Sequence, residues 1–172
     1  MILQVEEERL DAIKNYKLPA FNEIPDVGLY LNQSATYINK ALEPLFGQAI
    51  TESMISNYVK KKLIDNPVKK QYSREMIAYL LFIAVAKNVA SLDDLQFLIQ
   101  KQKLKYNAKE AYEYFQRAFE TILKSVFGFD ASKDDKEKRT VEEELLENII
   151  VTVAHKLYVD IAFDILKKEE EN

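Results

Sequence analysis

Two apolar seams in the second half of the chain constrain its fold more than any other feature. The first seam lies in residues 108–126, where apolar side chains recur at spacings of 4, 3, 4, 3 and 4: Ala108, Tyr112, Phe115, Phe119, Ile122 and Val126. This heptad spacing gives an α-helix one continuous apolar face. The second seam, in residues 140–168, contains Leu145, Ile149, Val153, Leu157, Ile161 and Ile165. It predicts a helix about 42 Å long, and the charged residues 129–139 between the seams are expected to form a linker.

The rest of the sequence also favours helices. Three Gly and four Pro in 172 residues are few, which disfavours a turn-rich β fold. Amphipathic spacing predicts further helices over 5–16, 29–42, 52–62, 74–88 and 92–100, with Pro44 and Gly47 ending the second. Thr51 and Ser73 are the expected caps of the helices over 52–62 and 74–88, and Thr140 with Glu143 forms a capping box at the start of the second seam. We therefore expect an all-α, mainly helical chain with an N-terminal helix (1–18), a central domain (19–105) and a C-terminal helical hairpin (106–172).

Positive charge is concentrated in residues 51–74. This segment contains six cations and only two carboxylates, Glu52 and Asp65, so its net charge is +4, whereas the whole chain carries −4. The cations are Lys60, Lys61, Lys62, Lys69, Lys70 and Arg74. An acidic protein that collects its cations on one helix and the following loop is suited to meet a polyanion there. The alternative is that Lys60–Lys62 form an ordinary solvated helix end, where cations favour the dipole.

The helix predicted over 52–62 has a polar stripe opposite its inward-facing apolar side, which contains Met54, Ile55, Tyr58 and Val59. Ser53, Ser56, Asn57 and Lys60 occupy positions i, i+3, i+4 and i+7 and therefore share one face. Asparagine can pair with the edge of adenine, serine can contact bases or phosphates, and lysine neutralises phosphate. Residues 63–72 then place Lys69 and Lys70 between apolar anchors and predict a short β wing. We expect Ser53, Ser56, Asn57 and Lys60 in the major groove of double-stranded DNA, and Lys61, Lys69, Lys70 and Arg74 on phosphates.

The order of these elements resembles that of the MerR-type regulators, which have a winged helix-turn-helix. The matching features are Tyr58, the apolar pair Leu63–Ile64 that enters the wing, and a helix start at Ser91–Leu95, and Pro67 lies one residue later than the proline of that family. Three positions differ, since Ser56 stands where that family has an arginine, Lys62 where it has a glycine, and Lys69 or Lys70 where an arginine follows the proline. The resemblance implies a recognition helix over 52–62 and a small β wing over 63–72.

Three further stretches carry a closer resemblance, which covers roughly residues 18–105: PDVGLYLNQ (25–33), MISNYVKKKLI (54–64) and PVKKQYSRE (67–75). They are similar to an uncharacterised family of Gram-positive bacteria, catalogued as domain of unknown function 1836 and itself considered MerR-like. The resemblance implies a sequence-specific DNA-binding transcriptional regulator. The alternative is a helical protein–protein interaction module that keeps the winged fold without binding DNA.

The C-terminal seams leave two questions open. Tyr112, Phe115 and Phe119 either line a pocket for a small apolar effector or belong to the core or a partner surface. The two C-terminal helices either pack on the central domain or join two chains. Because operators of winged-helix regulators are usually bound by dimers, we expect a homodimer formed through residues 106–172.

Sequence patterns for catalysis and metal binding are absent. The chain has no Cys, no Gly-rich phosphate loop and no HExxH motif, and its single histidine, His155, lies in an apolar stretch. Glu142, Glu143, Glu144 and Glu147 lie at a helix start, where the dipole favours carboxylates. We expect no enzymatic activity, metal or cofactor. An acidic N-terminus without a signal-peptide pattern, and no apolar run of roughly 20 residues, predict a soluble cytoplasmic protein without membrane contact.

Overall fold

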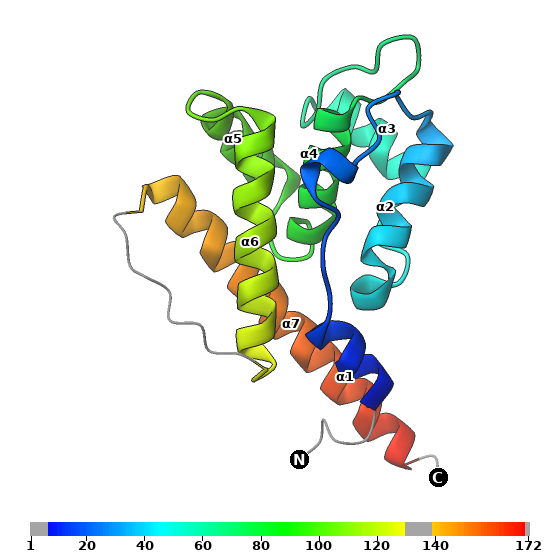
Figure 1. Cartoon of the computed structure of the whole chain (residues 1–172), viewed down its shortest axis with the longest axis vertical. Coiled ribbons are helices and arrows are strands. Elements are labelled where there is room, and N and C mark those ends of the chain that lie inside the picture. The colour runs from blue at the N-terminus through cyan, green and yellow to red at the C-terminus, as the bar shows by residue number, and fades with distance from the viewer. Residues whose placement is uncertain (1–6, 130–138, 171–172) are drawn as a thin grey trace. The chain divides into compact units, whose positions relative to one another are not determined.

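A computed structural model describes residues 7–129 and 139–170, and within them the chain is mainly helical, as predicted (Figure 1). The elements are α1 (Glu7–Lys14), the 3-10 turn η2 (Phe21–Glu23), α2 (Leu31–Phe46), α3 (Glu52–Lys60), α4 (Arg74–Ala86), α5 (Leu92–Lys103), α6 (Ala108–Val126) and α7 (Val141–Glu170). β-Structure in the described residues consists of two isolated bridges, Leu29 with Tyr72 and Val68 with Gln71. Most of the predicted linker and the first two residues of the predicted helix over 5–16 lie outside the described ranges. Among the described helices, none is both long and apolar enough to cross a bilayer.

The chain divides into two compact units. The central unit is Leu18–Arg117 and contains α2 to α5 with the beginning of α6. The terminal unit combines Met1–Lys17 with Ala118–Asn172 and contains α1, the end of α6 and α7. The division differs from the predicted one, because the N-terminal helix joins the C-terminal helices in one unit and the central unit extends beyond residue 105.

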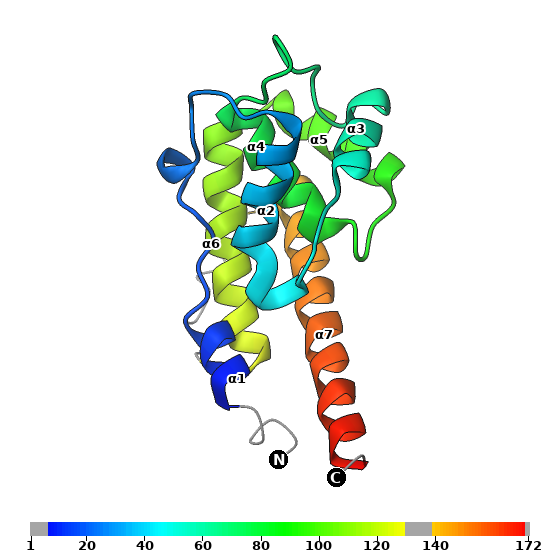
Figure 2. The same ribbon diagram turned by 90° about the vertical axis from the view of Figure 1, so that its right-hand side faces the viewer.

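α4 forms the core of the central unit because it is apolar on nearly every side. Nine of its residues are buried, including Leu80, Leu81 and Ile83. A helix that is hydrophobic all round is stable only when other elements cover it. α2 packs against both α3 and α4, and Figure 2 shows α2 running alongside α4. The hydroxyl of Ser73 caps α4 by accepting a hydrogen bond from the Met76 N–H at 3.3 Å.

Pro44 does not end α2, which corrects the predicted end at residue 42. The helix continues to Phe46, and Gly47 ends it with a φ of 61°. Proline removes one N–H donor, and this loss is tolerated in the last turn of a helix where the residue is exposed to solvent, as Pro44 is. Gly47 adopts the positive φ that glycine permits without strain.

The connection between α2 and α3 is held by the side chain of Asn39. Its Oδ1 accepts hydrogen bonds from the N–H groups of Ala49 and Ile50, both at 2.9 Å, and its Nδ2 donates to the Ile50 carbonyl at 2.9 Å. Thr51 then caps α3 as predicted, because its hydroxyl accepts a hydrogen bond from the Met54 N–H at 3.1 Å. The start of α3 is thereby fixed relative to α2.

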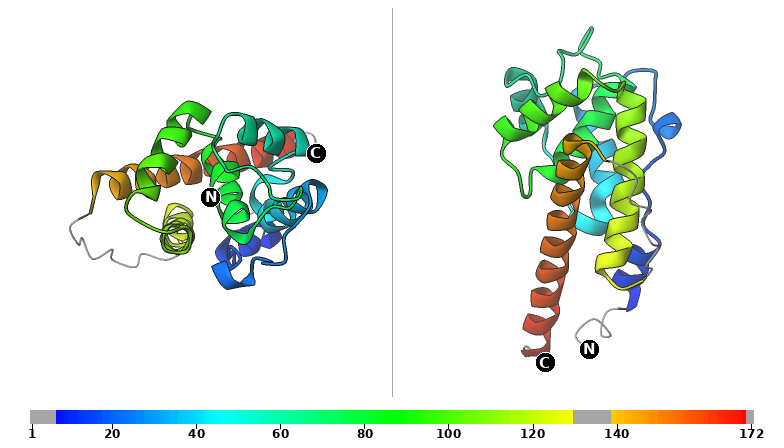
Figure 3. Two further views of the ribbon diagram at one scale, coloured as in Figure 1. Left: turned by 90° about the horizontal axis from the view of Figure 1, so that it is seen from above. Right: turned by 90° about the vertical axis from the view of Figure 1, so that its left-hand side faces the viewer.

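The terminal unit is built along α7, a single helix of 30 residues that Figure 3 shows as an uninterrupted rod. Its buried face consists of Ile150, Val153, Ala154, Leu157, Ile161 and Ile165. Leu145 and Ile149, which were predicted on the same stripe, are 47% exposed and half-buried, respectively. An aromatic contact joins the residue that follows α6 to α7, since the ring centroids of Phe127 and Tyr158 lie 5.4 Å apart.

Asn39→Ala is expected to lower the free energy of unfolding by about 2–3 kcal/mol, because it leaves the N–H groups of Ala49 and Ile50 without their acceptor. Urea unfolding followed by circular dichroism measures this change. Asn32→Ala, at an exposed position of the same helix, is the matched control and should stay within about 0.5 kcal/mol of the parent. Equal stability of the two variants would contradict the role assigned to Asn39.

Candidate nucleic-acid interface

α3 buries one side and presents a polar side to solvent. Ile55 and Tyr58 face inward and are 0% and 3% exposed, and burial raises the pKa of the Tyr58 hydroxyl. Ser53, Asn57 and Lys60 are exposed and Ser56 is half-buried. Three of the four predicted base-contacting residues are therefore exposed, and the fourth is half-buried.

One contact beside α3 was not predicted from the sequence. Met54, which was expected to face inward, is 38% exposed, and its sulfur lies 3.6 Å from the Nζ of Lys87 at the end of α4. Burial lowers the pKa of the Lys87 ammonium. Lys87 thus adds a cation next to α3, and no sequence signal points to it because it lies 33 residues from Met54.

The lysines at the end of α3 form a left-handed turn. Lys61 is the C-cap residue, and Lys62 follows with a φ of 58°. The N–H of Leu63 donates to the Tyr58 carbonyl at 2.9 Å, and the N–H of Lys62 donates to the Val59 carbonyl at 3.0 Å. These are the two hydrogen bonds of a Schellman motif, in which glycine usually occupies the position that Lys62 has. Lys62 therefore adopts a glycine-like backbone conformation while its side chain stays exposed.

Lys69 and Lys70 form the two-residue tip of a β-hairpin. Val68 and Gln71 exchange two backbone hydrogen bonds, of 3.1 and 2.9 Å, and the φ angles of Lys69 and Lys70 are 51° and 63°. Positive φ at both central residues is typical of a type I′ turn, for which Asn-Gly is the preferred sequence. The left-handed conformation costs a side-chain-bearing residue roughly 1–2 kcal/mol. Two exposed lysines are thus held in a conformation that lysine disfavours.

The base of this Lys69–Lys70 hairpin is attached to the segment that precedes α2. Tyr72 donates to the Leu29 carbonyl at 2.7 Å, and Leu29 donates to the Tyr72 carbonyl at 3.0 Å. Gly28 has a φ of 81°, and a Cβ there would stand 3.0 Å from the side chain of Gln71. Glycine is therefore favoured at position 28 both by its backbone conformation and by the close approach of the hairpin.

Arg74 holds the same segment from the other side. Its Nε donates to the Ile24 carbonyl at 2.7 Å and its Nη2 to the Asn22 carbonyl at 3.3 Å. Its guanidinium also lies 3.7 Å from the Asp26 carboxylate and 5.7 Å from the centroid of the Phe21 ring. Only 22% of its side chain is exposed. We therefore assign Arg74 to supporting the hairpin base, in place of the phosphate contact predicted for it.

The aromatic residues predicted to line an effector pocket are packed against other rings. Tyr112 and Phe115, in the central unit, and Phe119, in the terminal unit, are 3%, 2% and 0% exposed. Their ring centroids lie near those of Phe21 at 6.1 Å, Phe82 at 5.3 Å and Tyr16 at 6.2 Å, respectively. The three rings therefore belong to the core of their units and do not line the predicted effector pocket.

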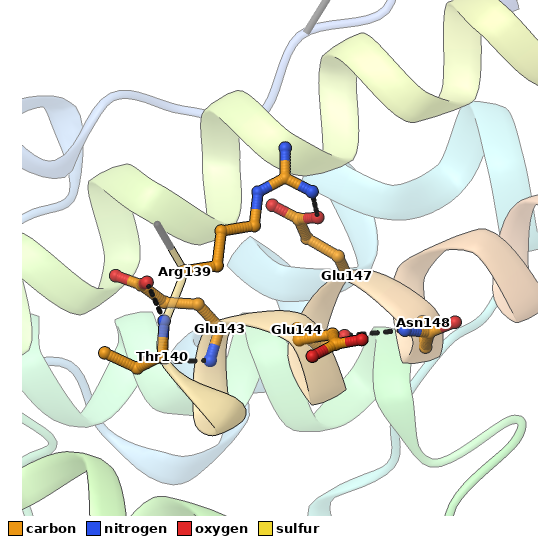
Figure 4. Close-up of polar contacts among 6 residues, drawn as sticks. All are labelled: Arg139, Thr140, Glu143, Glu144, Glu147 and Asn148. Carbon is orange, nitrogen blue, oxygen red and sulfur yellow. Dashed lines mark hydrogen bonds and ion pairs between the residues drawn. The ribbon is translucent and has the colours of Figure 1, made fainter. Parts of the chain in front are cut away.

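The carboxylates at the start of α7 form helix-capping contacts (Figure 4). The Thr140 N–H donates to the Glu143 carboxylate at 2.8 Å, and the Glu143 N–H donates to the Thr140 hydroxyl at 3.2 Å, which is the predicted capping box. Glu147 is paired with Arg139. In residues 7–129 and 139–170, no three His, Cys, Asp or Glu side chains are grouped so as to hold a metal ion.

Charge differs strongly between the two units. The central unit has 13 Lys and Arg against 10 Asp and Glu, a net of +3, whereas the terminal unit has 11 against 18, a net of −7. Asp65, one of two carboxylates near the lysine clusters, lies 3.6 Å from Lys103 of α5. Residues 51–74 carry a net charge of +4, so this segment accounts for the positive net charge of the central unit.

One comparison with known proteins gives a match. The profile of a protein family described as "Domain of unknown function (DUF1836)" matches residues 19–120. No curated protein and no solved structure matches the chain. The matched range includes α3 and the Lys69–Lys70 hairpin.

Lys62→Gly is expected to raise the free energy of unfolding by about 1 kcal/mol, because glycine adopts positive φ without strain. Lys61→Gly removes the same charge one residue earlier, where φ is −80°, and should lower that free energy by roughly 0.5–1 kcal/mol. Thermal and urea unfolding of the two variants measure the difference. Destabilisation by Lys62→Gly would contradict the strained conformation at Lys62.

Proposed function

The chain belongs to the DUF1836 family, and from the geometry of α3 and the Lys69–Lys70 hairpin we propose that it is a sequence-specific DNA-binding transcriptional regulator. In this proposal, α2 and α3 form a helix-turn-helix of the MerR-like winged type. α3 lies in the major groove, and the Lys69–Lys70 hairpin is the wing that contacts the phosphate backbone.

The observation that carries the proposal is the left-handed backbone at three lysines. In the described residues, the non-glycine positions with positive φ are Lys62, Lys69 and Lys70. A turn selected only for stability would have glycine or asparagine at these positions, whereas a surface that binds a polyanion gains from cations there. Strained backbone is typically kept where function requires the side chain. Lys62 also stands where the MerR-type pattern has a glycine, and its φ of 58° supports the same turn in this chain.

The accessible face of α3 supports a role in sequence recognition. Asn57 is exposed at the centre of this face, with Ser53 one turn before it and Lys60 three residues after it. An asparagine side chain can form two hydrogen bonds to adenine, and lysine and serine can contact bases or phosphates. The clamp by Asn39 and the Thr51 cap hold α3 rigidly, which a base-contacting helix requires.

The charge distribution supports an approach of DNA to the central unit. The central unit's net charge of +3 attracts a polyanion, and the terminal unit's net charge of −7 disfavours contacts between that unit and DNA. Such a field steers the encounter and weakens as salt is added.

A second candidate function rests on an exposed apolar face of α5. Phe97 and Leu104 are 61% and 81% exposed, and the Lys101 Nζ lies 5.4 Å from the centroid of the Phe97 ring. These three residues occupy positions i, i+4 and i+7, and such a face suits a protein partner. If duplex DNA does not bind, a protein–protein interaction module is the favoured alternative.

Lys69→Asn combined with Lys70→Gly tests the wing, because it installs the preferred type I′ sequence while removing two charges. We expect the free energy of unfolding to rise by about 1 kcal/mol and duplex affinity to fall. The slope of log binding constant against log salt concentration should become less negative by about 1.8, since each phosphate contact contributes about −0.9. Urea unfolding and fluorescence anisotropy measure the two effects.

The matched control for this variant is Lys14→Asn with Lys17→Asn, which removes two exposed lysines from the terminal unit. It should leave the salt slope unchanged. A hairpin variant that binds duplex as the parent does, with the same slope, shows that the wing assignment is wrong.

Asn57→Ala tests base recognition by α3. Loss of a bidentate contact should reduce the preference for the selected site by about 1–3 kcal/mol, and affinity for random duplex should change little. Selection from a random duplex library, followed by competition binding, measures the preference. The outcome that contradicts the assignment is an unchanged ratio of specific to random affinity.

A further inference from the structure

α7 is apolar on two opposite faces. One face is buried within the terminal unit, as described above. The other carries Val141, Leu145, Val159, Phe163 and Leu166, which are 78%, 47%, 48%, 57% and 39% exposed. One apolar face is sufficient for a helix to pack within its own unit. A second apolar face that is exposed to solvent indicates a site for a partner.

The exposed face follows a heptad repeat. Leu145, Thr152, Val159 and Leu166 are seven residues apart and occupy one heptad position. A second heptad position is occupied by Val141, Asn148, His155 and Ala162, each four residues before a member of the first set. These eight residues, which we call the α7 seam, are all exposed or half-buried. The residues of α7 that are buried lie at other heptad positions, so the packing of the terminal unit leaves the seam available.

We propose that the α7 seam pairs with the same seam of a second copy of this chain in an antiparallel arrangement. The two-fold axis crosses the pair of helices at the level midway between Val153 and Ala154. The seam is self-complementary under this operation. Reversing the helix about that point exchanges Val141 with Leu166, Leu145 with Ala162, Asn148 with Val159, and Thr152 with His155. Every seam position thus meets a seam position of the partner, as a two-fold interface requires. Phe163 flanks the Leu145–Ala162 layer.

The apolar area fits a second copy. The five exposed apolar residues present roughly 450 Å² of apolar surface. A standard stable interface buries about 800 Å² on each partner, of which about 55–65% is apolar. The exposed apolar area of one α7 is therefore about what one side of such an interface needs.

Charge favours the antiparallel orientation. The first turn of α7 contains Glu142, Glu143 and Glu144, whereas the last turn combines Lys167 and Lys168 with Glu169 and Glu170 and is close to neutral. Antiparallel pairing brings each acidic end to within about one turn of the partner's lysines, and it opposes the two helix dipoles. Asp164, near the same end, is paired with Arg9 at 3.3 Å. A parallel pair would place the two acidic first turns side by side.

The proposed dimer involves only the terminal unit and does not depend on DNA binding. Molecular mass in solution, measured without DNA, tests it separately from the proposed function. The parent chain of 20.0 kDa is expected to sediment with twice that mass at tens of micromolar. A mass of 20.0 kDa at these concentrations overturns the proposal.

Phe163→Glu places a charge beside the seam in each copy and should raise the dissociation constant of the dimer at least tenfold. Thr121→Glu adds the same charge at an exposed position of α6 and should leave the mass unchanged. Circular dichroism checks that both variants keep their helix content. A Phe163→Glu protein that stays dimeric contradicts the proposal.

The absence of cysteine in the sequence allows the orientation to be tested by cross-linking. Val141→Cys and Leu166→Cys should form no covalent dimer when each is oxidised alone, because antiparallel pairing separates identical positions by most of the helix length. An equimolar mixture of the two should give a disulfide-linked heterodimer. Cross-linking of Val141→Cys with itself overturns the antiparallel arrangement.

Discussion

The burial of α4 positions every element that the proposed function uses. Because α4 is apolar on nearly all sides, α2 and its neighbours must cover it, and the residues at its two ends are thereby fixed. Tyr72 and Arg74, around its N-terminus, hold the hairpin base and the segment before α2. Lys87, just past its C-terminus, reaches α3. A hydrophobic constraint thus determines where the polar and cationic side chains lie.

The lysines at Lys62, Lys69 and Lys70 show a local conflict between backbone preference and side-chain choice. Each adopts a conformation that favours glycine or asparagine, and each is exposed to solvent. Natural sequences depart from local preferences mainly where function compensates for the lost stability. The same residues carry three of the six positive charges of residues 51–74. This coincidence is the physical basis of the proposed DNA contact.

Local signals in the sequence predicted much of the fold, and tertiary contacts account for the misses. The caps at Thr51, Ser73 and Thr140 were predicted because each involves residues three positions apart. The Asn39 clamp spans ten and eleven residues, and the Arg74 contacts with Ile24 and Asn22 span about fifty, so no local pattern reveals them. The second apolar face of α7 was hidden for another reason. Its residues lie among those of the buried face, and the sequence alone does not distinguish the two.

The most direct test of the central claim is fluorescence anisotropy of the full chain with a random-sequence duplex over a range of salt concentrations. If Lys60, Lys61, Lys62, Lys69 and Lys70 all contact phosphates, affinity should fall with salt with a log–log slope of about −4.5 for each chain bound. Absence of binding at low salt and tens of micromolar protein would contradict the proposed DNA interface, as would an affinity that does not depend on salt.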